Sequence, residues 1–536
     1  MRFLIAISIF ISACAAIPES TVSNPSGLTI IHVNDTYRVA DVEDGTRGGF
    51  GRVITVIRQA QSEGRDVHVL HGGDLLAPSL ESQIWHGEQM VKAMNFVDDI
   101  APAYFVAGNH EIDFRDRDSA YFVNAVKTSR FDWLGDNYVF KTGDSAVDVK
   151  LLTAFTFAHG DKTIGVFAVT LTPEDAGLSP RSYVEYDRDY MGNAERVIKE
   201  HEANGVDMIV GITHLPMHND EELTGLRRDH PRFEFIVGGH EHEANSRPQS
   251  KDSAAIFKGS SNARVIWRID VDFDDNGAAF ISANRLDMDM NVTKDPDYAQ
   301  FENDWRQKVL ELYPIVDAKV GVASDRFNVT EESVRNEENG WANFIADQAR
   351  GAFGKPDADF AFINSGSLRI DDYIADDITY EDIARTFGFS SALRRMTLSG
   401  AEFVTLLEAG YRGEGRSKGY FPQISGFRVC VDRGRPDYSR IVSLQVPGDS
   451  GWHEIVADQD YTLVIPDFLF GDRDGYTMPR SAKESATPPG TVLQYLVLDA
   501  IIKSQAKGEK IGAKVDPANP RFVELVSTRG QCWTEG

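Results

Sequence analysis

Short apolar segments alternate with amphipathic segments from residue 27 to about residue 284, and this alternation constrains the fold more than any other feature. The apolar segments have the length of buried strands: LTIIHV, VHVLHG, AYFVAG, TIGVFAV, MIVGIT, FEFIVGG and VIWRIDVDF. Two segments between them, GRVITVIRQAQSEG and NAERVIKEHEANG, carry apolar residues at helical spacing. Strands that alternate with helices predict an α/β domain with a largely parallel sheet.

A second α/β pattern follows a predicted connecting helix, PDYAQFENDWRQKVLELYP. Its strand candidates are ADFAFINSG and GFRVCVD, and its helix candidate is SGAEFVTLLEAGY. A chain of 536 residues exceeds the size of one ordinary hydrophobic core. We therefore predict a first domain over residues 27–285, a linker helix within residues 286–320 and a second domain over residues 321–526.

The charge balance of the chain is strongly acidic, with 55 Lys and Arg against 82 Asp and Glu and a formal net charge of -27. A surface of this charge repels nucleic-acid polymers and anionic membranes. We therefore expect no nucleic-acid partner. A phosphate-bearing substrate must be captured by local positive charge, supplied by metal ions or by a few arginines.

The first 18 residues are predicted to be an export signal, because one basic residue precedes an apolar stretch and then small residues. The segment ISAC, ending at Cys14, also resembles the bacterial lipobox, whose cysteine becomes a lipid anchor. Cleavage after the region of Ala15 and Ala16, which would remove Cys14, is the alternative. Either way the protein is expected to be periplasmic, on the cell surface or extracellular, with membrane contact only through a lipid on Cys14.

Two further cysteines, Cys430 and Cys532, follow the leader. In an oxidising compartment they can form a disulfide that ties the C-terminal tail to the second domain. Their spacing does not distinguish this pairing from two free thiols, so both alternatives stay open.

Five of the predicted strands in the first domain end in polar residues. A single histidine or aspartate after a strand is more often a cap or a turn residue. Five in order predict a shared site, because the carboxyl ends of such strands meet at one edge. The residues are Asp35, Asp74, the group Asn109, His110 and Asp113, His214, and the pair His240 and His242.

These residue types suit two divalent metal ions. Carboxylate, imidazole and amide ligands fit Mn, Zn, Fe, Co or Ni better than the all-oxygen environment that Ca prefers. A carboxylate such as that of Asp74 can bridge two ions, and two adjacent ions can hold a phosphoryl group for in-line attack. The glycines in HGGD, AGNH and GGHEH permit the tight turns that bring several ligands together.

The motifs GNHE and GGHEH resemble those of the calcineurin-like metallophosphoesterases, and residues 27 to 526 as a whole resemble the 5′-nucleotidase family. That family includes periplasmic UDP-sugar hydrolases and 2′,3′-cyclic nucleotide phosphodiesterases. The resemblance implies an α/β fold, with a four-layer β-sandwich flanked by helices and a second α/β (α+β) substrate-binding domain.

The resemblance also implies roles for single residues of the first domain. The first metal would be bound by Asp35, Asp74 and His242, and the second by Asp74, Asn109, His214 and His240. His110, oriented by Asp113, would stabilise the phosphoryl group or the leaving oxygen in the transition state. The alternative is that His110 only maintains the shape of the site.

In the second domain, INSGSLR resembles the family sequence Asn-Gly-Gly-Gly-Ile-Arg. This implies that Asn364 and Arg369 contact the substrate, with the guanidinium holding a phosphate. GYFPQISG and GDRDGYTM match segments that supply two base-stacking aromatic rings, here Phe421 and Tyr476. The alternative is that both are ordinary core residues. Serines interrupt the glycine run of the first motif.

Tyr37 departs from the usual family pattern Asp-x-His, in which the histidine binds the first metal. The tyrosine could bind as a phenolate, although an unperturbed phenol has a pKa of about 10. It could instead leave the position to water and weaken the first metal, or mark an inactive site. We favour the second alternative, because HVNDTY, GGDLLAPSLES and GEQM resemble a branch of the family that has this tyrosine and keeps the other ligands.

The sequence thus predicts an exported, metal-dependent phosphohydrolase of nucleoside 5′-monophosphates. A UDP-sugar hydrolase or a 2′,3′-cyclic nucleotide phosphodiesterase would use the same residues. A nucleotide-binding surface protein without turnover is the alternative outside the enzyme class.

Overall fold

The computed structural model describes residues 27–413, 418–449, 451–512, 515–525 and 532–533. The predicted export signal, residues 1–18, and the predicted lipid anchor at Cys14 lie outside the described residues. Among the described residues, no helix is both long enough and apolar enough to cross a membrane.

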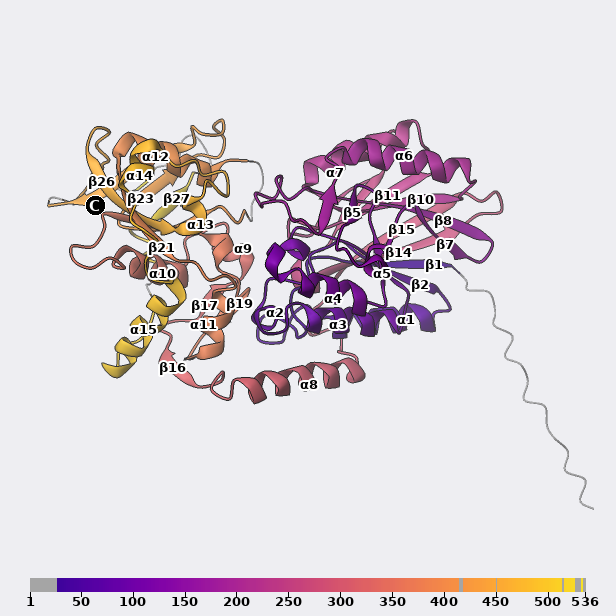
Figure 1. The fold of residues 1–536 in the computed structure, drawn as a ribbon, viewed down its shortest axis with the longest axis horizontal. Helices are drawn as coiled ribbons and strands as arrows, with labels where there is room; N and C mark the ends of the chain where they lie inside the picture. Colours follow the sequence, from indigo (N-terminus) through magenta and orange to yellow (C-terminus); the bar gives the residue numbers. More distant parts are fainter. Residues whose placement is uncertain (1–26, 414–417, 450, 513–514, 526–531, 534–536) are drawn as a thin grey trace, which may run out of the picture.

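Two sheets form the centre of the first domain (Figure 1). The seven-stranded sheet has the order β15-β14-β1-β2-β3-β4-β6, and the six-stranded sheet has the order β12-β13-β11-β10-β8-β7. The strands of the first are β1 (Leu28–Val33), β2 (Asp66–His71), β3 (Ala103–Val106), β4 (Asp132–Leu134), β6 (Leu151–Leu152), β14 (Val265–Phe273) and β15 (Ala279–Asp287). Those of the second are β7 (Phe155–His159), β8 (Lys162–Thr170), β10 (Met208–His214), β11 (Phe233–Gly238), β12 (Asn245–Arg247) and β13 (Ala255–Lys258).

Helices cover the outer faces of both sheets, so the first domain has four layers. Alternate residues of β8 show the arrangement: Val166 packs between the sheets, whereas Phe167 packs toward α6. The covering helices are α1 (Phe50–Ser62), α3 (Glu88–Asp98) and α4 (Ala120–Thr128) on one side, and α6 (Tyr190–Ala203) and α7 (Met217–Thr224) on the other. Shorter elements are α2 (Leu80–Trp85), α5 (Ser145–Asp148), β5 (Tyr138–Phe140) and β9 (Val184–Tyr186). The predicted four-layer α/β fold is confirmed.

The helix predicted to connect the domains is α8 (Pro296–Leu312). Asp295 caps it, because its side chain accepts hydrogen bonds from the backbone N–H groups of Asp297 and Tyr298. Tyr298 and Trp305 are buried against the first domain, where Tyr298 packs on Phe50 of α1. The helix therefore belongs to the first domain along most of its length and leads into the second, as Figure 1 shows. The boundaries at residues 285 and 320 stay predictions.

The second domain is built on the four-stranded sheet β21-β26-β18-β22. One face packs on α10 and α15, and the other faces α12 and a second four-stranded sheet, β25-β24-β23-β27. The main strands and helices are β18 (Phe360–Asn364), β21 (Leu393–Ser399), β22 (Pro422–Ser425), β23 (Arg428–Val431), β24 (Ile441–Gly448), β25 (Gly451–Glu454), β26 (Asp460–Pro466), β27 (Phe522–Glu524), α10 (Gly340–Arg350), α12 (Gly400–Glu408) and α15 (Leu493–Ala506). Shorter elements are β16 (Lys319–Val322), β17 (Phe327–Val329), β19 (Asp372–Ile374), β20 (Asp377–Thr379), α9 (Glu331–Val334), α11 (Tyr380–Thr386), α13 (Asp467–Phe470) and α14 (Arg480–Ser485).

A disulfide joins Cys430 of β23 to Cys532. Of the two alternatives that the sequence left open, the structure shows the pairing. It ties residue 532, near the end of the chain, to the sheet of the second domain.

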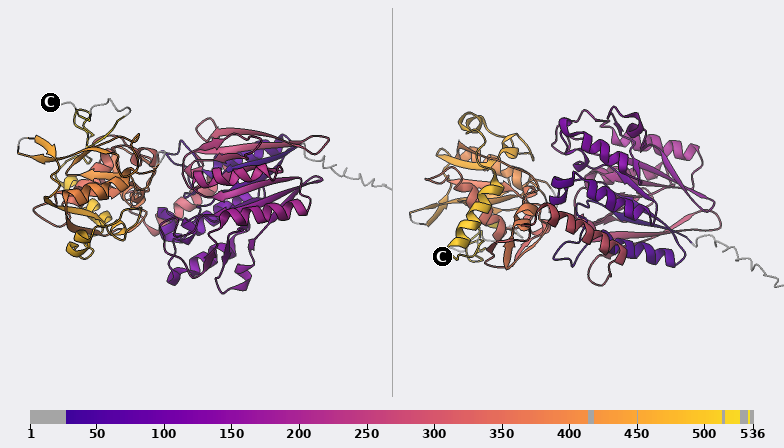
Figure 2. Two further views of the ribbon diagram at one scale, coloured as in Figure 1. Left: turned by 90° about the horizontal axis from the view of Figure 1, so that it is seen from above. Right: turned by 60° about the horizontal axis from the view of Figure 1, so that its bottom comes forward.

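The two domains remain separate lobes in each view of Figure 2 and meet along one face. Ion pairs cross this boundary; the side chains of two of them are largely buried, whereas those of Arg326 and Asp44 are exposed. The pairs are Arg38 with Asp372, Arg264 with Asp371, and Arg326 with Asp44. The polar ends of the first domain's strands lie beside this boundary, because Tyr37 and Arg369 line the same pocket.

Candidate metal centre and interdomain pocket

The strand ends of the first domain bring the predicted ligands of the first metal together. Asp35 follows β1, Asp74 follows β2 and His242 follows β11. Each offers one ligand atom, and these atoms all lie within 4.8 Å of one another. All three side chains are buried. We call Asp35, Asp74 and His242 the first ligand group.

The predicted ligands of the second metal also converge. The Asn109 Oδ1 atom lies 3.2 Å from His214 Nε2 and 3.3 Å from His240 Nδ1, and His214 Nε2 lies 3.4 Å from Asp74 Oδ2. His214 Nδ1 faces the carbonyl oxygen of Gly72 at 2.7 Å. A proton on Nδ1 would donate to that carbonyl and leave Nε2 free to bind a metal.

The protonation of the site fits a metal centre. Burial alone would lower the pKa of His214, but Asp74 and Asp35 outweigh burial and raise it to about 10. Burial would likewise lower the pKa of His242, but Glu331 and Asp35 raise it to about 9. Protons on these imidazoles thus balance the buried carboxylates, and a bound divalent ion would take over that role and release the protons.

Some of the predicted ligands also have an unusual backbone conformation. A positive φ is uncommon for a residue other than glycine, and it persists where the surrounding structure imposes it. Four predicted ligands have this conformation: Asp35 (φ 52°), Asp74 (φ 60°), His240 (φ 90°) and His242 (φ 63°). The converging donor atoms show that these residues fit a metal centre.

Tyr37 lies inside the first ligand group. Its hydroxyl is 3.2 Å from Asp35 Oδ1, 3.2 Å from Asp74 Oδ2 and 2.8 Å from His242 Nε2. Burial, together with the charges of Asp74 and Asp35, raises the pKa of the phenol well above its usual value of 10. A neutral phenol donates hydrogen bonds to the carboxylates and is a poorer metal ligand than an imidazole. This geometry favours a weakly bound first metal over a phenolate ligand.

We predict that Tyr37→His strengthens Mn or Zn binding at the first ligand group by about 10-fold or more, because changes around a metal site typically alter affinity by 10–100-fold. Competition with a fluorescent chelator measures this affinity. Tyr37→Phe is the matched control: it removes only the hydroxyl and should leave the affinity near that of the wild type. An unchanged affinity in Tyr37→His would place residue 37 outside the coordination sphere.

His110 and Asp113 form a pair beside the ligands. His110 begins a short 3₁₀ helix (His110–Ile112), and its backbone N–H donates to Asp74 Oδ1 at 2.8 Å. Its Nδ1 atom lies 2.7 Å from Asp113 Oδ2, which leaves Nε2 directed to within 3.9 Å of Asp74 Oδ2. Burial would lower the pKa of His110, but Asp113 and Asp74 outweigh it and raise the pKa. The ring is thus held as a proton donor next to the metal ligands.

Glu111 organises the ligand loops, and the sequence analysis missed it. Its buried carboxylate accepts hydrogen bonds from the backbone N–H groups of Asp74, Leu75, Leu76 and Gly108. Burial, with the charge of Asp74, raises its pKa to about 7. The signal was its place inside the GNHE motif, where a glutamate follows the histidine.

Asn262 and Glu331 were also missed. Asn262 accepts from the backbone N–H of Tyr37 at 3.1 Å and donates to Asp371 at 2.9 Å, so it links the first ligand group to the second domain. Glu331, at the start of α9, contacts His242. Nothing in the sequence spacing identifies either residue, because their partners are far away in the chain.

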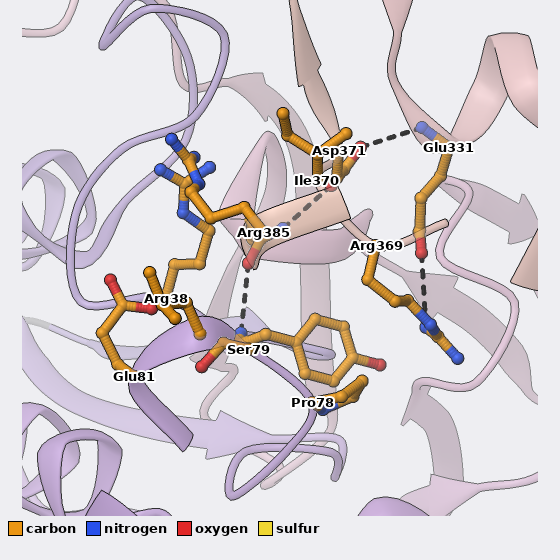
Figure 3. Close-up of a pocket in the computed structure, with 12 residues that line it drawn as sticks. Arg38, Pro78, Ser79, Glu81, Glu331, Arg369, Ile370, Asp371 and Arg385 are labelled. Carbon is orange, nitrogen blue, oxygen red and sulfur yellow. Dashed lines mark hydrogen bonds and ion pairs between the residues drawn. The ribbon is translucent and has the colours of Figure 1, made fainter. Parts of the chain in front are cut away.

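Arg369 reaches the centre from the second domain. It lines a small interdomain pocket together with Tyr37, Pro78 and Glu331 (Figure 3). Its Nε atom donates to the carbonyl oxygen of Gly366 at 2.8 Å, and Nη1 lies 3.4 Å from Glu331 Oε1. The positive charge of Arg369 also counters the rise in the pKa values of Tyr37 and His110. The guanidinium therefore lies close enough to act on the metal-centre side chains.

Asn364 lies deeper in the second domain than Arg369. Its Nδ2 group donates to Asp474 at 2.9 Å, and its Oδ1 atom accepts from the Ser367 hydroxyl at 2.6 Å. The side chain is buried and does not line the interdomain pocket. Substrate contact by Asn364 stays a prediction.

Phe421 and Tyr476 do not form an open clamp in this arrangement, and base stacking by the two rings stays a prediction. They are 2% and 0% exposed and belong to the core of the second domain. Phe421 packs edge-on against Phe522, and Tyr476 packs on Phe362 and donates its hydroxyl to the carbonyl oxygen of Tyr420. The alternative weighed for them, ordinary core aromatic residues, describes their environment.

We predict that Phe421→Ala lowers the free energy of unfolding by about 3–5 kcal/mol, as for other buried phenylalanines. Tyr476→Phe should cost only about 1 kcal/mol, because it removes one hydrogen bond and keeps the ring. Urea unfolding followed by circular dichroism measures both. A loss well under 1 kcal/mol for Phe421→Ala would mean that the ring is not part of a packed core.

Two family models match the chain. The model for calcineurin-like phosphoesterase matches residues 28–244, and the model for the 5′-nucleotidase C-terminal domain matches residues 318–481. The first match lies within the first domain, and the second match lies mainly within the second.

Curated relatives and solved structures are similar over almost the whole chain. The trifunctional nucleotide phosphoesterase YfkN of Bacillus subtilis is 24% identical over 91% of this chain, which spans 34% of the length of that relative. The snake venom 5′-nucleotidase of Gloydius brevicauda is 24% identical over 87% of this chain and 84% of its own. The structure of a 5′-nucleotidase precursor from Thermus thermophilus aligns with a TM-score of 0.77 at 21% identity, covering 93% of this chain and 99% of that one. This last likeness shows the fold.

Proposed function

We infer that this chain, which belongs to the 5′-nucleotidase family of calcineurin-like phosphoesterases, removes phosphate from nucleoside 5′-monophosphates with the help of two divalent metal ions. As a family member it is a hydrolase of phosphoric ester bonds. The observation that carries the proposal is the convergence of the two ligand sets, which share Asp74, beside His110 and opposite Arg369.

Two bound ions of Mn, Zn, Fe, Co or Ni would supply Lewis acidity and a water nucleophile at neutral pH. Asp35, Asp74 and His242 would hold the first ion, and Asp74, Asn109, His214 and His240 the second. Glu111 fixes the loops that carry Asp74 and Asn109, because it accepts the backbone N–H groups of Asp74 and Gly108.

His110 and Arg369 are the groups that would act on the phosphate itself. His110, held by Asp113 at Nδ1, can donate a proton or a hydrogen bond from Nε2 to a phosphoryl or leaving oxygen. Arg369 faces the centre from the other domain, and its fork of N–H groups matches two phosphate oxygens. It supplies the local positive charge that a chain with a net charge of -27 needs to capture an anion.

The proposed substrate class and the proposed location of the protein are supported by different observations. The names of the relatives contain nucleotide phosphoesterase and 5′-nucleotidase, and Arg369 supports a phosphate ligand. Phe421 and Tyr476 are buried, so the proposal does not rest on base stacking, and it does not specify a base. The N-terminal segment supports export, with a periplasmic, cell-surface or extracellular location.

Hydrolysis of AMP, UDP-glucose and 2′,3′-cyclic AMP tests the proposal, with inorganic phosphate measured for AMP and the phosphomonoester products separated by chromatography for the other two. The full-length protein is assayed with Mn, Zn, Co and Fe, and again after chelation. We expect phosphate release from AMP that chelation abolishes, and slower hydrolysis of the other two substrates. Faster turnover of UDP-glucose or the cyclic nucleotide would select that alternative. Tight AMP binding with no turnover under any metal would support the nucleotide-binding protein instead.

A further inference from the structure

Glu331 places a carboxylate of the second domain directly on a predicted metal ligand of the first. Its Oε2 atom contacts Nδ1 of His242, across a sequence separation of 89 residues. Its backbone N–H donates to Asp371 Oδ1 at 2.9 Å, and its side chain is only 7% exposed. The contact is therefore buried at the boundary between the domains.

This contact determines which nitrogen of His242 faces the metal centre. Nδ1 faces Glu331, and Nε2 faces Asp35 at 3.2 Å. A metal-binding histidine is commonly oriented by a carboxylate or carbonyl that accepts a hydrogen bond from its other nitrogen, and that partner strengthens binding.

The corresponding partner of His214 belongs to its own domain. His214 Nδ1 faces the carbonyl oxygen of Gly72, which precedes Asp74 in the same loop. The predicted second metal site therefore uses His214, which the first domain orients by itself. The predicted first metal site uses His242, which the second domain orients.

We propose that Glu331 is a positioning residue that orients His242 for the first metal from the second domain, so that the full affinity of this site requires the docked arrangement of the two domains. The inference rests on the proposed metal centre. It goes beyond that centre by assigning a role to a residue that binds neither metal nor substrate.

The other oxygen of Glu331 extends the connection to the phosphate side of the site. Oε1 lies 2.5 Å from Arg335 Nη2. It also lies 3.4 Å from Arg369 Nη1, a contact that Figure 3 shows. One carboxylate thus holds a metal ligand with one oxygen and the proposed phosphate-binding guanidinium with the other. Arg335 balances its charge, which makes a buried carboxylate tolerable at this position.

The test is metal affinity, measured without substrate on the full-length protein by competition with a fluorescent chelator for Mn²⁺. Glu331→Ala should lower the affinity for one of the two ions by ~10–100-fold and leave the affinity for the other near its wild-type value. Glu331→Gln, whose amide oxygen can still accept from Nδ1, should retain part of the lost affinity. Glu332→Ala is the matched control, since this neighbouring glutamate is exposed on the same short helix, and it should behave as the wild type.

The inference would be overturned if Glu331→Ala bound each of the two ions with the same affinity as the wild type. It would also be overturned by an equal loss of affinity for both ions accompanied by a lower melting temperature of the metal-free protein, because that would indicate a merely structural role. If the alanine variant does not fold, Glu331→Gln decides, and wild-type affinity at both sites contradicts the inference. Because no substrate is used, the result does not depend on which phosphoester the enzyme cleaves.

Discussion

Asp74→Asn is expected to abolish phosphate release almost completely, with a loss greater than the ~10²–10³-fold that removal of a single charge-stabilising group costs. The reason is that Asp74 belongs to both ligand sets. It lies within 4.8 Å of the ligand atoms of Asp35 and His242, and its Oδ2 atom is 3.4 Å from His214 Nε2. Metal content, measured by elemental analysis after dialysis, should fall together with turnover of AMP.

Asp136→Asn is the matched control for this prediction. Asp136 is another buried aspartate of the first domain, and its carboxylate accepts from the backbone N–H groups of Ala154 and Ala168, away from the metal centre. We expect it to keep wild-type metal content. Two ions per chain with undiminished turnover in Asp74→Asn would contradict the assignment of Asp74 as the shared ligand.

His110→Ala is expected to lower kcat by ~10²–10⁴-fold, the usual contribution of a positioned proton donor. Metal content should stay at the wild-type level, because Asp113 rather than a predicted ligand holds the Nδ1 atom of His110. Steady-state kinetics with AMP and elemental analysis of the same preparation separate the two effects.

His453→Ala serves as the control, since this histidine lies on the exposed strand β25 of the second domain. It should change neither kcat nor metal content. A His110 variant that keeps more than a tenth of the wild-type kcat would support the alternative that His110 only maintains the shape of the site.

The fold of both domains followed from patterns that are local in the sequence. LTIIHV is buried throughout, because the second sheet covers one face of β1 and helices cover the other. The connecting helix was predictable from its periodicity and from Asp295 and Pro296 at its start. Packing of the two sheets against each other could not be read from any one segment, and it entered through the family resemblance.

The convergence of the predicted metal ligands could be expected because each follows a strand, and strand ends of a parallel sheet meet at one edge. Glu331 and Asn262 could not be predicted in this way. Their partners, His242 and Tyr37, belong to other parts of the chain, and only the docking of the domains brings them together.

The aromatic residues of the second domain show what a sequence motif cannot predict. Phe421 and Tyr476 match family motifs, but a motif records the residue type and not whether a ring is covered. Both rings are buried in one core, to which α12 also contributes. Their exposure could be determined only from the packing.

The most direct test of the account is a titration of metal-depleted protein with Mn²⁺ while phosphate release from AMP is followed. The account predicts no release without metal and a rise in rate that ends at two equivalents per chain. Release that is independent of metal, or the absence of release at any metal concentration, would contradict it.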